Sequence, residues 1–216
     1  MDTDFARQQM VDQQVRAWDV LHPDVLRVLR NIPREQFVPT GYEALAFADT
    51  EIPIGHSQFM MTPTLEGRVL QALKPTSTDN VLEIGTGSGF LAACLARLSD
   101  SVTSVDIHDD FLEAAKVNLE DSGISNVKLL SMDAMQKLPD EKFDVVAITG
   151  SIEDFDPRFV EALNPSGRLF VVVGAGPAMD ARLVTRTGDN DWQSESLFET
   201  VLAPLVNGSK LPQFLF

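Results

Sequence analysis

The chain has 216 residues, 44% of them hydrophobic, which is enough for one domain with a sizeable core. Its 17 Lys and Arg face 32 Asp and Glu, and this net charge of −15 argues against a nucleic-acid partner, which requires a basic footprint. The apolar runs are too short to cross a bilayer, the acidic start is unlike a secretory signal, and the lone Cys94 excludes an internal disulfide, so we expect a cytoplasmic protein with no membrane segment.

Helical patterns occupy the first part of the chain. Apolar residues at helical spacing predict a pair of helices over 7–30, with a break at His22-Pro23, because proline is favoured at the start of a helix. The stretch 34–63 is punctuated by proline and glycine, and we expect it to be irregular and functional. A further helix is predicted over 64–73. We expect one domain, with helices and a substrate and cofactor loop over 1–75 and a core over 79–216.

From residue 79 onward, short apolar runs alternate with helical stretches. Such alternation implies an α/β fold with a mostly parallel sheet and helices on both of its faces. Two late segments are expected to complete the sheet as a hairpin. Strands are predicted over 81–84, 101–105, 127–130, 143–148 and 169–173, helices over 90–98, 109–119 and 156–163, and the hairpin over 181–185 and 197–202.

A glycine-rich loop follows the first of these strands. Residues 81–90 read Val-Leu-Glu-Ile-Gly-Thr-Gly-Ser-Gly-Phe, which places the glycines at a strand–turn–helix junction. Loops there bind ligands at the carboxyl edge of the sheet, and glycine lets the backbone approach the ligand closely. Asp106 ends the next strand, at the spacing expected for a carboxylate that binds the ribose hydroxyls of an adenosine.

Two cofactor classes use this arrangement. Dinucleotide enzymes have the spacing Gly-x-Gly-x-x-Gly, whereas this loop has Gly-x-Gly-x-Gly and an acidic residue, Glu83, just before it. A carboxylate suits a cationic ligand better than a diphosphate, which favours S-adenosyl-L-methionine; Glu83 holding the loop is the alternative. A P-loop is excluded, because no Gly-Lys-Ser/Thr follows.

An acidic residue also follows the third strand. Asp133 lies where an adenine amino group is expected, although a turn-capping role is equally consistent with its position. The predicted cofactor contacts are Glu83, Gly85, Thr86, Gly87, Ser88, Gly89, Asp106, Ile107, Asp133 and Ala134.

Beyond the loop, the chain resembles the protein-L-isoaspartate O-methyltransferases, which methylate isoaspartyl carboxylates in damaged proteins. The most distinctive match is Pro-Arg-Glu-Gln-Phe-Val-Pro at 33–39, and others are Met-Val-Asp-Gln-Gln-Val-Arg at 10–16, Ile-Pro-Ile-Gly-His at 52–56 and Ala-Pro-Leu at 203–205. The resemblance implies a Rossmann-like class I methyltransferase fold with an N-terminal helical extension. It also implies S-adenosyl-L-methionine as cofactor and isoaspartyl proteins or peptides as substrates.

The chain departs from this family in the loop that follows Ile-Gly-His. The family pattern there is Gly-Gln-Thr-Ile-Ser-x-Pro, in which Thr and Ser hold carboxylates. Phe59 replaces the Thr and Met61 the Ser, and neither side chain donates a hydrogen bond to a carboxylate. Both would make the acceptor pocket more apolar. The candidate acceptor-site residues are His56, Ser57, Met61 and Thr62, with Ser57 and Thr62 as replacement donors.

Three functions follow from this departure. The first is isoaspartyl methylation, the second is methylation of a different acceptor, and the third is binding of S-adenosyl-L-methionine without turnover. No metal site is expected, because His22, His56 and His108 are scattered along the chain, and His22 and His108 are interpreted as surface residues. The apolar tail over 210–216 is interpreted either as a closing strand or as a homodimer contact.

Overall fold

The N-terminal part of the computed structural model, which describes residues 3–209, is helical. Helix α1 (Thr3–Gln9) runs into a π-helical stretch (Met10–Val15) and a 3₁₀ turn (Arg16–Trp18), and helix α2 spans Pro23–Asn31. Pro23 stands at the first position of α2, so the predicted helical pair and its break are confirmed. The tail discussed above lies outside the described residues.

The stretch expected to be irregular contains more structure than predicted. It has two 3₁₀ turns (Arg34–Gln36 and Glu43–Leu45) and an antiparallel hairpin of β1 (Ile52–Gly55) and β2 (Gln58–Met60). The expectation of an irregular segment is therefore wrong for the hairpin. Strands of four and three residues, the first containing a proline, are too short to show an alternating pattern.

The hairpin turn has an unusual backbone. His56 and Ser57 have φ values of 49° and 56°, so both are left-handed, as a two-residue hairpin loop of the mirror-image type requires. Asn and Gly are the usual residues in such turns, whereas most other residues are strained there.

Replacing Ser57 with glycine is therefore expected to raise the free energy of unfolding by roughly 1 kcal/mol. Urea denaturation of the variant and the wild type measures this difference. Ser77 is an exposed serine without positive φ and serves as the control, and Ser77→Gly should give no gain. Equal stabilisation by both substitutions would show that the turn is not strained.

Helix α3 (Pro63–Leu73) leads into the central sheet. The helix lies where it was predicted, and it begins at Thr62, whose side-chain oxygen accepts a hydrogen bond from the Leu65 amide. The strands that follow are β3 (Asn80–Ile84), β4 (Ser101–Asp106), β5 (Val127–Ser131), β6 (Phe143–Ile152), β7 (Leu163–Val173), β8 (Met179–Arg186) and β9 (Trp192–Thr200), and the helices are α4 (Phe90–Ala96), α5 (Asp109–Asp121) and α6 (Arg158–Glu161).

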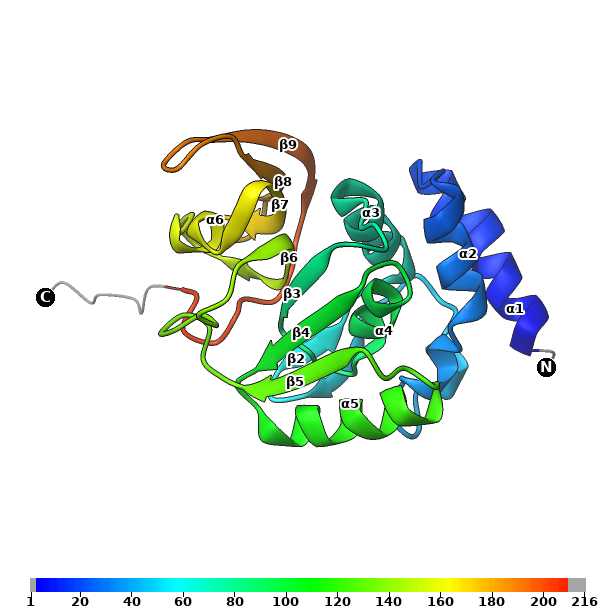
Figure 1. The fold of residues 1–216 in the computed structure, drawn as a ribbon. Helices are drawn as coiled ribbons and strands as arrows, with labels where there is room; N and C mark the ends of the chain where they lie inside the picture. Colours follow the sequence, from blue (N-terminus) through cyan, green and yellow to red (C-terminus); the bar gives the residue numbers. More distant parts are fainter. Residues whose placement is uncertain (1–2, 210–216) are drawn as a thin grey trace, which may run out of the picture.

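The seven strands form one twisted sheet in the order β5-β4-β3-β6-β7-β8-β9 (Figure 1). Strands β5, β4, β3, β6 and β7 are parallel to one another. Strand β8 is antiparallel to β7, and β9 is antiparallel to β8. The predicted Rossmann-like α/β fold with a mostly parallel sheet, a late hairpin and an N-terminal helical extension is confirmed. None of the helices within residues 3–209 has the length and apolar character needed to cross a membrane.

Both faces of the central strands of the sheet are buried. Along β3, Val81 packs into one hydrophobic cluster, whereas Leu82 and Ile84 pack into the other. The first cluster contains residues of α2, α3 and α4, and the second contains Phe159 and Val160 of α6. The central strands thus form a layer between two cores, which leaves their carboxyl ends as the place where a ligand can reach them.

Two predicted boundaries are wrong near the end of the sheet. Strand β6 extends to Ile152 with an irregularity between Ala147 and Ser151, so residues 149–152 belong to the strand rather than to a following loop. Helix α6 has only four residues, and Leu163 begins β7 instead of ending a helix. Pairing with β6 decides both boundaries, since Phe143 lies opposite Leu163 and Ile152 opposite Val173.

Candidate functional site

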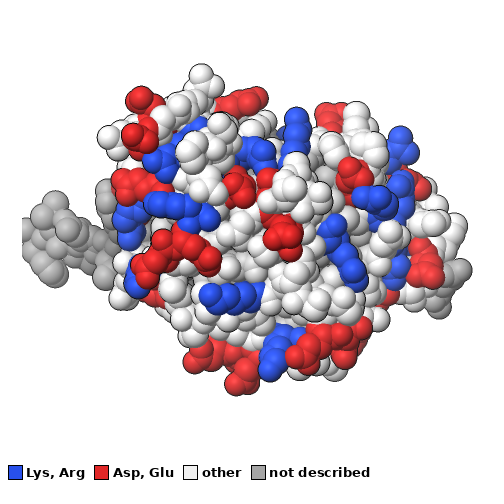
Figure 2. Space-filling view, viewed as in Figure 1, with Lys and Arg blue, Asp and Glu red and all other residues white. Residues whose placement is uncertain are grey.

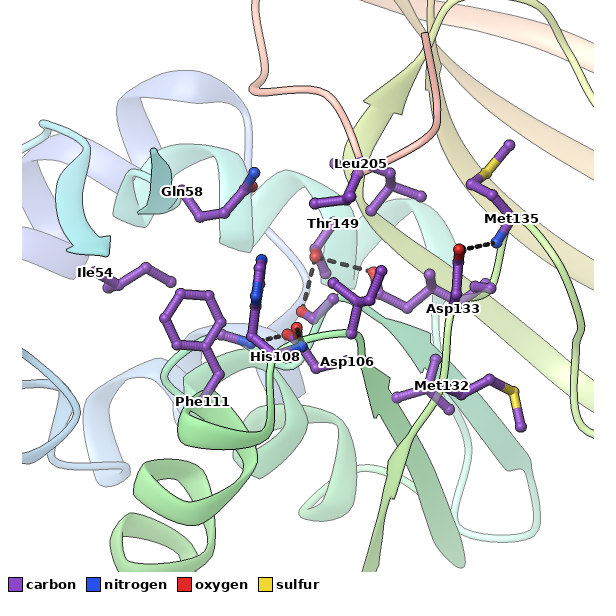
Figure 3. Close-up of a pocket in the computed structure, with 18 of the residues that line it drawn as sticks. Ile54, Gln58, Asp106, His108, Phe111, Met132, Asp133, Met135, Thr149 and Leu205 are labelled. Carbon is purple, nitrogen blue, oxygen red and sulfur yellow. Dashed lines mark hydrogen bonds between the residues drawn. The ribbon is translucent and has the colours of Figure 1, made fainter. Parts of the chain in front are cut away.

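A pocket lies where the strand order reverses. From β3 the chain moves outward through β4 and β5 and then returns to β6 on the other side, and the carboxyl ends of these strands surround a cavity that is partly open to solvent. Ligands of open α/β sheets bind at such switch points. The cavity is lined by Ile54, Gln58, Phe59, Ile84, Gly85, Gly87, Val105, Asp106, Ile107, His108, Phe111, Met132, Asp133, Ala134, Met135, Thr149, Gly150, Leu205 and Val206 (Figure 3).

The glycine loop forms the floor of this pocket and is held from two sides. The Gly85 amide donates to the Val105 carbonyl over 2.8 Å, which ties the loop to β4. On the other side, the Thr149 hydroxyl donates to the carbonyls of Ile84 and Gly85, at 3.0 and 2.8 Å. Sequence reasoning missed this role of Thr149, which depends on the continuation of β6 beyond Ile148.

Asp106 presents its carboxylate at the end of β4. Oδ2 accepts from the Gly87 amide over 2.9 Å and Oδ1 from the His108 amide over 3.0 Å. These two bonds fix the carboxylate between the glycine loop and the start of α5, where it lines the cavity. A carboxylate oxygen has two lone-pair sites, so each oxygen retains capacity to accept a ligand hydroxyl.

Asp133 follows β5 and also lines the pocket. Its Oδ1 accepts from the Met135 amide at 2.9 Å, the turn-capping contact that the sequence left as an alternative. Its Oδ2 accepts from Gln136 Nε2 and Asn207 Nδ2, both at 2.8 Å. Asp133 thereby joins the wall of the pocket to the segment that contains Leu205 and Val206.

Glu83 lies behind the glycine loop and does not line the pocket. Its fully buried carboxyl accepts from Ser104 Oγ, which is 2.6 Å from Thr86 Oγ1, so Glu83 supports the loop through two hydroxyls. Burial raises the pKa of Glu83 to about 8, opposed by the Ser104 hydrogen bond and reinforced by the nearby Asp106 and Glu66 carboxylates. The structure therefore shows the loop-supporting alternative for Glu83 and no direct contact with the pocket.

This raised pKa makes the stability depend on pH. Between the ordinary value of 4.5 and about 8, folded Glu83 keeps a proton that the unfolded chain has lost, so stability falls as pH rises. Glu83→Gln removes this titration. We expect the wild type to lose stability relative to the variant as pH rises across this range, on the order of 1 kcal/mol per pH unit. Thermal or urea denaturation at pH 5, 6.5 and 8 measures the difference, and parallel curves would contradict the prediction.

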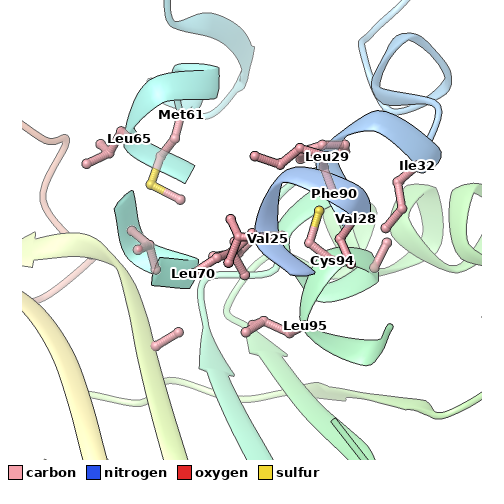
Figure 4. Packing of buried hydrophobic residues seen from close by; sticks show 14 of the residues in the cluster. Val25, Val28, Leu29, Ile32, Met61, Leu65, Leu70, Phe90, Cys94 and Leu95 are labelled. Atoms are coloured by element: carbon pink, nitrogen blue, oxygen red, sulfur yellow. The ribbon is translucent and has the colours of Figure 1, made fainter. Parts of the chain in front are cut away.

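The hairpin contributes Gln58 and Phe59 to the pocket, but not the predicted Met61. Phe59 is 43% exposed and lies at the rim, whereas Met61 is buried in the same cluster as Val25 and Leu65 (Figure 4). The expectation that Met61 makes the acceptor pocket more apolar is thus wrong, because its side chain packs in the core. The Thr62 hydroxyl is used in capping α3 and also lies 3.0 Å from that of Thr64.

Two histidines that are 52 residues apart meet at the rim. The imidazoles of His56 and His108 stack with ring centroids 4.0 Å apart, and His56 Nε2 lies 2.9 Å from Asp110 Oδ2. His108 is half-buried and lines the pocket, a position that its interpretation as a surface residue did not include. Asp106 was identified from its position at the end of a parallel strand, and the same reasoning applies to His108 two residues later.

Six of the predicted residues line the pocket: Gly85, Gly87, Asp106, Ile107, Asp133 and Ala134. The others lie behind or beside it. Gly89 begins α4 against Ala115, the carbonyl of Ser88 accepts from Asn118, and Ser57 is in the exposed hairpin turn. Besides Thr149 and His108, the lining residues that sequence reasoning missed include Phe111, Met132 and Met135.

The charge of the pocket suits a cationic ligand. Among the described residues, its lining contains two aspartates and neither Lys nor Arg. A diphosphate would lack a basic partner there, whereas a ligand with ammonium and sulfonium groups would not meet like charge. On the face shown in Figure 2, Lys and Arg are interspersed with Asp and Glu and form no continuous basic stripe.

Comparison with known proteins agrees with this geometry. The family model described as protein-L-isoaspartate(D-aspartate) O-methyltransferase matches residues 6–210. Protein-L-isoaspartate O-methyltransferases of Koribacter versatilis and Methanoculleus marisnigri are 33% and 35% identical, over 94% and 84% of this chain and 93% and 84% of the relatives.

The fold is also found in a solved structure. The protein from Plasmodium falciparum described as a putative protein-L-isoaspartate O-methyltransferase, in complex with S-adenosyl-L-homocysteine, superposes with a TM-score of 0.79. The match covers 92% of this chain and 97% of that protein, at 18% sequence identity, and so concerns the fold. On the family match and the two relatives, the chain belongs to the protein-L-isoaspartate(D-aspartate) O-methyltransferase family.

Proposed function

We propose that the chain binds S-adenosyl-L-methionine in this pocket and transfers its methyl group to isoaspartyl carboxylates of proteins or peptides. The observation that carries the proposal is the Asp106 carboxylate, fixed beside Gly87 at the carboxyl end of β4. Membership in the family supports the reaction, and the absence of Lys and Arg from the described pocket lining supports the cofactor.

The residues of the pocket divide the binding between them. Asp106 would accept hydrogen bonds from the ribose hydroxyls, and the backbone of Gly85 and Gly87 leaves room for the methionine part of the cofactor. Ile107 and Ala134 would flank the adenine. Asp133, which lines the pocket beside Ala134, would accept a hydrogen bond from the adenine amino group. When bound, S-adenosyl-L-methionine supplies a methyl group that its sulfonium already activates.

The chemistry requires little else from the protein. A carboxylate acceptor is ionised at pH 7, so no strong general base is needed. The remaining contribution is alignment of the acceptor oxygen with the methyl group and exclusion of water from the reacting atoms. Gln58, Phe59, Leu205 and Val206 line the pocket, and we assign both tasks to them.

The one observation that favours a different acceptor is Phe59. It lies at the rim, where the family pattern has a threonine, and it offers a carboxylate no hydrogen bond. Gln58 is then the side chain of this loop that lines the pocket and has an amide to donate. We assign it the acceptor-holding role, which the sequence had assigned to Ser57 or Thr62.

The test measures methyl transfer from labelled S-adenosyl-L-methionine to an isoaspartyl peptide and to its normal aspartyl twin. Cofactor binding is measured in parallel by calorimetry. Transfer to the isoaspartyl peptide alone is the expected result. Binding without transfer to this peptide would reject the acceptor assignment, and absence of binding would reject the cofactor site.

A pair of matched variants ties the activity to the pocket. Asp106→Asn is expected to weaken cofactor binding by roughly tenfold or more, because hydrogen bonds to a charged group contribute about 1.5–3 kcal/mol. Asp109→Asn removes a carboxylate three residues further on, outside the pocket lining, and should bind the cofactor like the wild type. Equal effects of the two substitutions would contradict the role of Asp106.

A further inference from the structure

We propose that His56, His108 and Asp110 form a binding site for a divalent transition-metal ion such as Zn²⁺ at the rim of the pocket. One potential ligand atom from each of the three side chains lies within 4.8 Å of the other two. The residues come from two elements, since His56 is in the β1–β2 turn and the others stand at the start of α5. This site goes beyond the proposed function, because methyl transfer from a sulfonium requires no metal ion.

One pair of donors has a spacing close to that of a zinc site, and the third lies within 4.8 Å of both. Ligands in a tetrahedral zinc site lie about 2.0–2.1 Å from the ion, and therefore about 3.3 Å from each other. His56 Nε2 and Asp110 Oδ2 are 2.9 Å apart. The side chains of His56 and Asp110 are 44% and 64% exposed, and we infer that the His56 ring turns out of its stack on His108 as an ion binds.

The third donor is available for a ligand. His108 Nε2 is buried and has no hydrogen-bond partner within residues 3–209. Phe111 packs edge-on against both imidazoles, with ring centroids 5.3 Å from His56 and 5.2 Å from His108, and so holds the two rings together.

The donor set selects the class of ion. Two imidazoles and one carboxylate suit Zn²⁺, Ni²⁺, Cu²⁺ or Fe²⁺, whereas Mg²⁺ and Ca²⁺ prefer oxygen ligands throughout. The carboxylate offsets part of the charge of the ion. Three protein ligands leave the remaining position to water, as in open zinc sites.

The test titrates the full-length protein, stripped of metal and free of cofactor, with ZnCl₂ in competition with a chromophoric chelator. We expect one ion per chain with micromolar affinity, and at least tenfold weaker binding for His108→Ala and for Asp110→Asn. Co²⁺ provides a second measurement on the wild type, because nitrogen-ligated tetrahedral Co²⁺ has characteristic visible absorption. MgCl₂ in excess should leave the Zn²⁺ titration unchanged.

Two controls remove the same side-chain types elsewhere. His22→Ala and Asp109→Asn should bind Zn²⁺ like the wild type, since neither residue belongs to the cluster. The proposal is overturned if the wild type binds no stoichiometric ion, if the controls weaken binding as much as the site variants, or if Mg²⁺ competes. Because no cofactor is present, none of these results bears on the methyl-transfer proposal.

Discussion

Gly85→Ala is expected to lower the free energy of unfolding by about 2–5 kcal/mol and to abolish cofactor binding. Two effects add at this position. Gly85 has φ of 98°, where an alanine is strained, and its added Cβ would lie only 2.2 Å from Thr149 Oγ1. Since Thr149 holds the loop by bonding to Ile84 and Gly85, displacing its hydroxyl also releases the pocket floor. Urea denaturation and calorimetry with S-adenosyl-L-methionine measure the two losses.

Substitution of Gly41 is a control that distinguishes backbone strain from the steric collision with Thr149. Its φ of 93° nearly equals that of Gly85, but a Cβ built there has no neighbour within 4 Å. Gly41→Ala should therefore show the strain alone, roughly 1–2 kcal/mol, and bind the cofactor normally. In the double variant Gly85→Ala, Thr149→Ala, part of the lost stability should return. If Gly85→Ala is no worse than Gly41→Ala, the contact with Thr149 is not what fixes the loop.

The sequence was most informative where a function depends on local spacing. Gly85, Gly87 and Asp106 lie at strand ends, and the alternation of strands and helices brings these ends to one edge of the sheet. Short-range patterns therefore predicted the fold and six lining residues. The position of Glu83 was also accessible in principle, because residues on one strand alternate between faces and Ile84 lines the pocket.

What the sequence did not reveal depends on long-range pairing. Met61 follows the end of β2, where the chain turns into α3, so strand alternation no longer indicates its direction. Thr149 reaches the glycine loop only because β6 continues past Ile148 beside β7. The meeting of His56 with His108 depends on how the hairpin lies over α5. None of these relations has a signal in neighbouring residues.

Arg34, the arginine of the family segment Pro-Arg-Glu-Gln-Phe-Val-Pro, has a structural role. Its guanidinium is fully buried and forms an ion pair with Glu66 of α3. It also donates to the carbonyls of Ala46 and Met61, at 3.0 and 2.6 Å. One side chain thus connects the N-terminal extension, the stretch before the hairpin and the start of α3. The segment thereby contacts residues on both sides of the hairpin, although it is far from the cofactor loop.

Arg34→Met is accordingly expected to cost about 3–5 kcal/mol, because it leaves the Glu66 carboxyl buried without its partner. Arg34→Met combined with Glu66→Met should recover much of this loss, since no charge then remains buried. Arg27→Met is the control: its ion pair with Asp24 is exposed, with side chains 64% and 52% accessible, and should contribute no more than about 1 kcal/mol. Urea denaturation of the four proteins measures these differences. A loss for Arg34→Met no larger than for Arg27→Met would mean that the buried pair does not hold the hairpin to the core, and the family segment would then require another explanation.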